Sequence, residues 1–132
     1  MTDSAARDDR QDVTRRLLGL VLWYGLPIAA IYAAGHYLQD PRLIGLVWAS
    51  AFGVMGGKCL ANAMNCSRVH CYFTGPWLLL AAVASLLHGF GLSPSGWLTW
   101  GRIGNVGFIG ALLLWFGSEA IFGRYWHPRT DV

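Results

Sequence analysis

The residues of this chain that could do chemistry are concentrated in one short stretch, residues 58–76. All three cysteines of the protein, Cys59, Cys66 and Cys71, lie in this stretch, and His70 precedes the last of them. Thiolates and neutral imidazole are the ligands that soft and borderline ions such as Hg(II), Cu(I), Cd(II) and Zn(II) prefer. The spacing matches neither a zinc finger nor a C-x-x-C redox pair. The stretch therefore predicts a soft-metal site with three cysteine ligands and His70 as an auxiliary ligand.

Two conditions decide whether these sulfurs can share one ion. If the second apolar helix continues through the stretch, Cys59, Asn62 and Cys66 follow i, i+3, i+7 spacing and share one face. Cys59 and Cys66 are then about 10 Å apart along the helix axis, which is too far to share an ion directly. A shared site therefore requires that the helix unwinds before Cys66, or that Cys71 folds back onto another cysteine. Otherwise the cysteines are ordinary small apolar residues of a membrane helix.

Four other ionisable side chains are expected inside or at the edge of apolar segments, where such groups are costly. Lys58 and Glu119 lie at similar depths in the second and fourth segments, so an ion pair between them would explain why both are tolerated. Glu119 is alternatively a carboxylate for a cation or proton that moves toward the cysteines. His36 and His88 are expected in the opposite half of the membrane. They are either further ligands along a path or interfacial residues bonded to water or backbone.

The sequence contains no recognisable catalytic motif. It has no Gly-rich phosphate loop, no H-E-x-x-H and no C-x-x-C-H haem motif, and its serines have no acid–histidine context. The pattern therefore favours a binding or transport protein over an enzyme. Two alternatives stay open. One is a membrane thiol oxidoreductase, which needs a close cysteine pair. The other is a non-catalytic accessory or structural subunit whose polar stretch docks a partner.

Four apolar runs must position these residues. Of the 132 residues, 55% are hydrophobic and 13% are charged, against about 25% charged in ordinary soluble domains. Because about 20 helical residues cross the hydrocarbon core of a bilayer, we predict an all-α integral membrane four-helix bundle. Polar tails are expected at 1–16 and 124–132. The transmembrane domain is expected to cover 17–123, with spans at about 17–38, 43–62, 76–92 and 103–123.

Prolines and a glycine shape the expected helix boundaries. Pro27 lies in the middle of the first run and predicts a kink there. The second helix is expected to continue past Lys58 toward the cysteines. Thr74 or Gly75 is expected to cap the third helix, with Pro76 in its first turn. Cys71 would then lie past the turn and outside the third helix.

The distribution of basic residues predicts the orientation. With the N-terminus on one side of the membrane, that side receives eight Lys and Arg and the other receives only Arg42 and Arg102. The positive-inside rule then places both termini and the cysteine stretch in the cytoplasm, where thiols stay reduced. We expect a multi-pass protein of the cell inner membrane. Its partners would be the lipid bilayer and a second copy or another membrane protein, but no nucleic acid. The eight residues are Arg7, Arg10, Arg15, Arg16, Lys58, Arg68, Arg124 and Arg129.

In size, four-span layout and cysteine placement, the chain resembles the small bacterial inner-membrane mercuric-ion uptake proteins of the Mer group. The resemblance covers roughly residues 17–123, and it implies transport of a mercuric-type ion. Under it, the cysteines of the 58–76 stretch would act as a cytoplasmic acceptor site. Mer-type proteins typically carry a cysteine pair within the first span, and this chain has no cysteine there. Residues 62–76 look like a family signature that is not linked to an established activity; their sequence is NAMNCSRVHCYFTGP.

Overall fold

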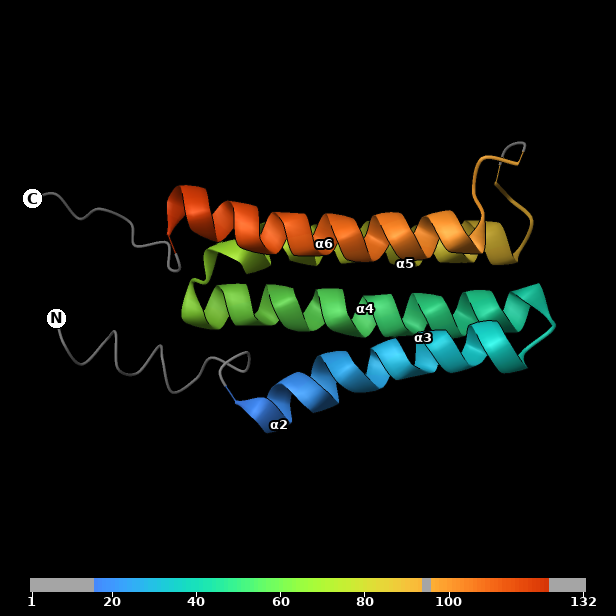
Figure 1. The fold of residues 1–132 in the computed structure, drawn as a ribbon, viewed down its shortest axis with the longest axis horizontal. Coiled ribbons are helices and arrows are strands. Elements are labelled where there is room, and N and C mark those ends of the chain that lie inside the picture. Colours follow the sequence, from blue (N-terminus) through green and yellow to red (C-terminus); the bar gives the residue numbers. More distant parts are fainter. Residues whose placement is uncertain (1–15, 94–95, 124–132) are drawn as a thin grey trace, which may run out of the picture.

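A computed structural model gives the structure of the protein, and it describes residues 16–93 and 96–123. In these two ranges the chain forms helices and connecting turns, with no extended β-sheet. Four rods are long and apolar enough to cross a membrane (Figure 1). This result confirms the predicted all-α, four-helix membrane architecture. Apart from Arg16, the expected polar tails lie outside the described residues. The four rods are Leu17–Tyr37, Pro41–Asn65, Val69–Gly89 and Trp100–Phe122.

The first rod contains a widened turn immediately before its proline. It runs from α2 (Leu17–Leu20) through the π-helical turn η2 (Val21–Gly25) into α3 (Leu26–Tyr37). Pro27 has no backbone N–H, and its ring would clash with the carbonyl one turn earlier in a regular α-helix. A π-turn changes the backbone spacing at that point. The sequence predicted a kink at Pro27, and the irregularity that the structure shows is the π-turn before it. The rod runs obliquely to the next helix (Figure 1).

Helix α4 (Pro41–Cys66) is the longest helix and has a defined signal at each end. The Asp40 carboxylate accepts a hydrogen bond of 2.9 Å from the backbone N–H of Arg42, and Pro41 occupies the first helical position. At the other end Ser67 adopts the left-handed conformation, with φ of 51°, which turns the chain out of the helix. The helix therefore continues past Lys58, as the sequence predicted, and it extends as far as Cys66.

Helix α5 (Val69–Gly89) begins seven residues earlier than the sequence predicted. The expected start at Pro76 is wrong, because Pro76 lies inside the helix and Thr74 and Gly75 precede it as helical residues. An interior proline costs a backbone hydrogen bond, but neighbouring helices can compensate for that loss. The extra turns are stabilised by burial against neighbouring helices. The residues buried there are Val69, His70, Cys71, Thr74 and Gly75.

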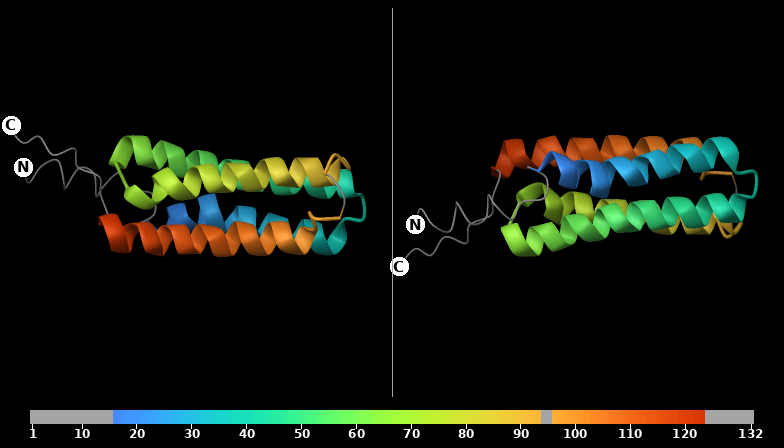
Figure 2. Two further views of the ribbon diagram at one scale, coloured as in Figure 1. Left: turned by 90° about the horizontal axis from the view of Figure 1, so that it is seen from above. Right: turned by 90° about the horizontal axis from the view of Figure 1, so that it is seen from below.

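Helix α6 (Trp100–Phe122) completes the bundle. The side chain of Thr99 caps it by accepting a hydrogen bond of 3.2 Å from the backbone N–H of Arg102. Figure 2 shows α6 and the first rod on one side of the bundle and α4 and α5 on the other. The beginning of α2, the end of α4, the beginning of α5 and the end of α6 all lie at the same end of the molecule (Figure 1).

Helices α4 and α5 pack with their backbones in contact. A Cβ added at Gly45 would lie 3.0 Å from the Cα of Gly89, and one added at Gly56 would lie 2.9 Å from the carbonyl oxygen of Gly75. Such glycines allow helices in lipid to approach closely and to gain van der Waals contact. The two glycine pairs therefore fix the spacing of α4 and α5, and the second pair lies near the cysteine stretch.

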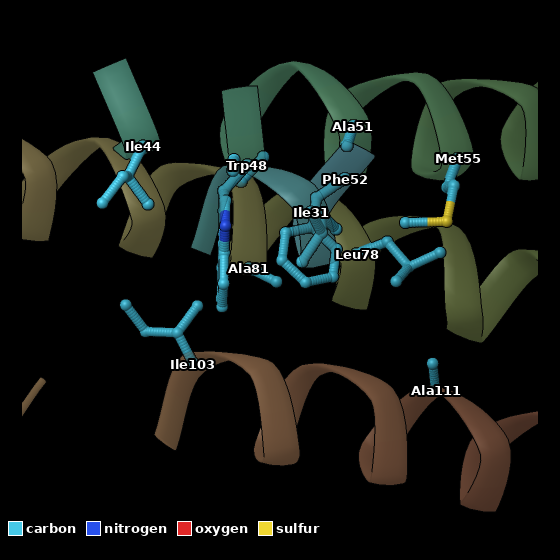
Figure 3. Packing of buried hydrophobic residues seen from close by; sticks show 12 residues of the cluster. Ile31, Ile44, Trp48, Ala51, Phe52, Met55, Leu78, Ala81, Ile103 and Ala111 are labelled. Atoms are coloured by element: carbon cyan, nitrogen blue, oxygen red, sulfur yellow. The ribbon is translucent and has the colours of Figure 1, made fainter. Parts of the chain in front are cut away.

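The core of the bundle is apolar over most of its length, and so is the outer surface. Figure 3 shows the core side chains, among them Ile31, Trp48, Phe52, Leu78 and Ile103, meeting from all four rods. The outward faces carry many exposed large hydrophobic residues. Exposed apolar surface of this extent is unusual for a monomeric soluble protein, and it indicates that the helices contact a lipid bilayer. Representative exposed residues are Leu22, Leu80, Val83, Ile109, Leu113 and Ile121.

Candidate metal site

Cys59, His70 and Cys71 come together at the end of the bundle where α4 turns into α5. One ligand atom from each residue can be chosen so that all three lie within 4.8 Å of one another, and all three residues are fully buried. The turn at Ser67 and Arg68 reverses the chain, so the first turn of α5 lies beside the last turns of α4. Cys71 therefore folds back onto Cys59 although α4 stays unbroken, which meets the second of the two conditions derived from the sequence.

The third predicted sulfur ligand, Cys66, is the last residue of α4. Its side chain lies outside the described part of the structure, so its role as a ligand stays a prediction. Cys66 is about 10 Å further along the helix axis than Cys59. The group formed by Cys59, His70 and Cys71 does not depend on it.

Each sulfur of the site is contacted by a neutral hydrogen-bonding side chain. The hydroxyl of Tyr24, from η2, lies 3.2 Å from Sγ of Cys59. The amide Nδ2 of Asn62 donates to Sγ of Cys71 over 3.6 Å. A metal-bound thiolate keeps lone pairs that accept such bonds, and partners of this kind orient metal ligands. The sequence predicted Asn62 on the cysteine face of α4, whereas Tyr24 was missed because it comes from the first rod.

The imidazole of His70 is held in place from its far side. Its Nδ1 lies 2.7 Å from Oε1 of Glu119, and Nε of Arg68 donates to the same carboxylate oxygen over 3.0 Å. The ring also stacks on the indole of Trp115, with centroids 4.0 Å apart and planes inclined by 7°. We assign the Nδ1 proton to the bond with the Glu119 carboxylate, which leaves the lone pair of Nε2 facing Cys71 Sγ at 3.2 Å. A carboxylate behind a histidine is the usual arrangement around a metal-binding imidazole.

The predicted ion pair between Lys58 and Glu119 is wrong. Glu119 pairs with Arg68 and with His70. Lys58 points toward the first rod instead, and its Nζ lies 4.5 Å from the centroid of the Trp23 ring. The error came from comparing depths alone, because depth does not say which way a side chain points around its helix. Arg68, predicted from the sequence to be one of the cytoplasmic charges, reaches across to α6 and donates to Glu119.

The other two predicted pathway residues lie away from the thiols. His36 near the end of α3 packs against Tyr32, with ring centroids 4.4 Å apart. His88 near the end of α5 packs edge-on against Trp100, with centroids 4.7 Å apart. Both helix ends lie at the end of the bundle opposite the cysteines (Figure 1). A path that links them to the site stays a prediction.

The structure also shows a constellation that the sequence did not reveal. Cys71, His70 and Glu119 form a chain of thiol, imidazole and carboxylate, with links of 3.2 Å and 2.7 Å. Nucleophile, base and orienting acid are arranged in this order in nucleophilic enzymes. Cys59 and Cys71 also form a close pair, although no C-x-x-C spacing in the sequence indicates one. However, both cysteines are fully buried, so a bulky substrate cannot reach them in this conformation, whereas a single ion needs far less room.

Comparison of the chain with protein-family models, with curated proteins and with solved structures finds no match in any of the three. The fold and the site therefore define the class of protein by themselves. It is a small multi-pass membrane protein that carries a buried Cys–His–Cys group able to hold a metal ion at one end of its helix bundle.

Proposed function

We propose that the protein binds a thiophilic metal ion at Cys59, His70 and Cys71 and moves it across, or delivers it at, the inner membrane. The observation that carries the proposal is the convergence of three buried ligand atoms within 4.8 Å of one another. Metal–sulfur bonds of about 2.3 Å and metal–nitrogen bonds of about 2.0 Å need only small side-chain shifts to meet at a common centre. Mercuric, cuprous and zinc ions all suit two thiolates and an imidazole.

The proposed cargo and direction rest on charge and architecture. The Mer-type resemblance favours a mercuric-type ion that is passed to a cytoplasmic acceptor. The end of the bundle that carries the site also holds the start of the first rod and the end of the last (Figure 1). In chain order, eight of the ten Lys and Arg fall before the first rod, near the α4–α5 connection or after the last rod. By the positive-inside rule this end, the metal site and both termini face the cytoplasm.

Metal uptake by the purified protein tests the proposal. The full chain in detergent would be loaded with Hg(II), Cu(I) or Zn(II) under reducing conditions, desalted and analysed for bound metal. We expect about one ion per chain, lost in Cys59→Ser and in Cys71→Ser. Cys66→Ser, measured alongside, tests whether the third predicted cysteine is a further ligand. Uptake by the Cys59→Ser/Cys71→Ser double variant equal to that of the wild type would contradict the proposal.

A second candidate function is thiol oxidoreduction, which the Cys59–Cys71 pair and the His70–Glu119 relay favour. Two thiols would be converted to one disulfide while a two-electron acceptor, such as a quinone or another protein's disulfide, takes up two electrons and two protons. Mass spectrometry after incubation with a membrane quinone separates the candidates. A Cys59–Cys71 disulfide that forms with turnover, without metal uptake, supports the oxidoreductase. If neither metal uptake nor disulfide formation is observed, the role of an accessory subunit remains.

A further inference from the structure

Thr74 carries a buried hydroxyl that has no hydrogen-bond partner among the described residues. The residue is 2% exposed, and its Oγ1 is one of only two buried side-chain polar atoms in that part of the chain without a partner. An unpartnered buried hydroxyl is costly. A helical threonine normally avoids the cost by bonding the carbonyl one turn earlier, as Ser85 does on the same helix, over 2.8 Å to the carbonyl of Ala81. The hydroxyl of Thr74 is therefore available to a ligand.

The position of Thr74 places that hydroxyl next to the metal ligands. On α5 it follows His70 by four residues and Cys71 by three. Side chains three and four residues apart are direct neighbours on a helix surface, with Cβ atoms about 5–6 Å apart. Thr74 thus lies one turn deeper in the bundle than His70, on the face of α5 that presents both ligands.

We propose that Thr74 supplies an oxygen donor that completes the metal site, either directly or through a metal-bound water. The inference rests on the proposed metal-binding function and deepens it. Cys59, Cys71, His70 and Thr74 would provide two sulfurs, one nitrogen and one oxygen. Four donors of these types suit the tetrahedral coordination of Zn(II) and, by its similar chemistry, Cd(II). Two-coordinate Hg(II) would need only the two sulfurs.

The charges around the site agree with a divalent ion. Two thiolates and one divalent cation sum to zero, while the imidazole and the hydroxyl are neutral. The carboxylate of Glu119 is already paired with Arg68. A monovalent ion such as Cu(I) would leave one uncompensated negative charge on fully buried ligands, and buried charges without a counter-charge are costly. Charge therefore favours a divalent ion over a monovalent one, and donor number favours Zn(II) or Cd(II) over the mercuric-type ion that the resemblance suggests.

Removal of the hydroxyl at constant side-chain shape tests the inference. Thr74→Val, Thr74→Ala, Thr74→Ser and the control Ser85→Ala would be purified as full chains in detergent and titrated with Cd(II) and with Ag(I), a stable monovalent substitute for Cu(I). We expect Thr74→Val and Thr74→Ala to weaken Cd(II) binding at least tenfold, within the range known for groups that support metal ligands. Thr74→Ser should restore it. Ser85→Ala should bind as the wild type does, and Ag(I) binding should not change in any variant.

A thermal melt of the metal-free proteins distinguishes a ligand-binding threonine from a merely structural one, whose replacement should lower the melting temperature. Thr74→Val should melt at or above the wild-type temperature, because it removes an unpartnered hydroxyl and keeps the shape. Wild-type Cd(II) affinity in Thr74→Val, or in Thr74→Ala if the valine variant does not fold, overturns the inference. An equal loss of Cd(II) and Ag(I) binding also overturns it. If the wild type takes up neither ion beyond the Cys59→Ser/Cys71→Ser double variant, the proposed function itself fails.

Discussion

At the scale of single residues, the site is a chain of contacts rather than a set of separate ligands. Nε of Arg68 donates to Oε1 of Glu119 over 3.0 Å, and the same oxygen lies 2.7 Å from Nδ1 of His70. Nε2 of His70 lies 3.2 Å from Sγ of Cys71. Each member fixes the orientation of the next, because a hydrogen bond at one end of an imidazole determines which way the other end faces. A substitution of Glu119 should therefore change the affinity for a metal ion, although Glu119 is not one of the proposed ligands.

We expect Glu119→Gln to weaken Zn(II) or Cd(II) binding by about 10- to 100-fold, because it keeps the shape but removes the carboxylate behind His70. Isothermal titration of the purified protein measures the effect. Lys58→Gln is the matched control, since Lys58 lies against Trp23 and not against Glu119. Equal losses in the two variants would contradict the role of Glu119 in positioning the imidazole.

The same ion pair makes a prediction about stability. We expect Glu119→Ala to lower the free energy of unfolding by about 2 kcal/mol, since it leaves the largely buried guanidinium of Arg68 without its carboxylate. Adding Arg68→Ala should recover part of that loss, because the unpaired charge is then removed too. Thermal melts of the single and double variants in detergent measure both steps. A double variant less stable than Glu119→Ala would show that Arg68 contributes mainly through other contacts.

At the scale of elements, the site depends on the close approach of α4 and α5. Cys59 comes from α4 and both other ligands come from α5, so the distance between these helices sets the distance between the ligands. Gly56 and Gly75 meet just deeper in the bundle than the site and permit the approach. The early start of α5 has the same effect, because it places His70 and Cys71 on a helix rather than in a loop.

We expect Gly56→Ala to destabilise the bundle by about 1–3 kcal/mol and to weaken metal binding, because the added Cβ would lie 2.9 Å from the carbonyl oxygen of Gly75. Gly53→Ala is the control on the same helix, since nothing lies within 4 Å of a Cβ added there. That control should be neutral or slightly stabilising, because alanine favours helix more than glycine does. Melting temperatures and metal titrations that do not distinguish the two variants would count against this account of the interface.

At the scale of the whole molecule, the bundle has two chemically different ends. One end holds the buried thiols together with the Arg68–Glu119 pair. The opposite end holds Arg42, Arg102 and the aromatic partners of His36 and His88. The apolar core of the bundle lies between them. This asymmetry agrees with the proposed loading or release of an ion at one face of the membrane.

Reporter fusions test the orientation of these two ends. We expect fusions after Asp40 and after Leu92 to report the periplasm and a fusion at the C-terminus to report the cytoplasm, because of the eight-to-two division of Lys and Arg. Arginines added beside Arg42 should weaken this preference for one orientation, because they reduce the charge difference between the two ends. Arg42→Lys keeps the charge and serves as the control. A cytoplasmic signal after Asp40 would reverse the proposed orientation.

The sequence by itself determined the class of protein. The free energy of transferring a segment to lipid is approximately the sum of its residues' contributions. Composition and run length were therefore sufficient to predict four spans and an all-α bundle. Local chemistry was equally readable. Three residues of the candidate site, Cys59, His70 and Cys71, were selected from their residue types, and the continuation of α4 past Lys58 toward Cys66 was expected.

Only the tertiary structure decided which residues meet. Tyr24, Arg68 and Glu119 meet the candidate ligands because of how each helix is rotated about its axis and which helix lies beside it, and neither quantity is encoded locally. The misplaced start of α5 has the same origin. Pro76 is a local signal for a helix start, but burial of the preceding turn against the other helices outweighs it, and that burial exists only once the bundle has formed.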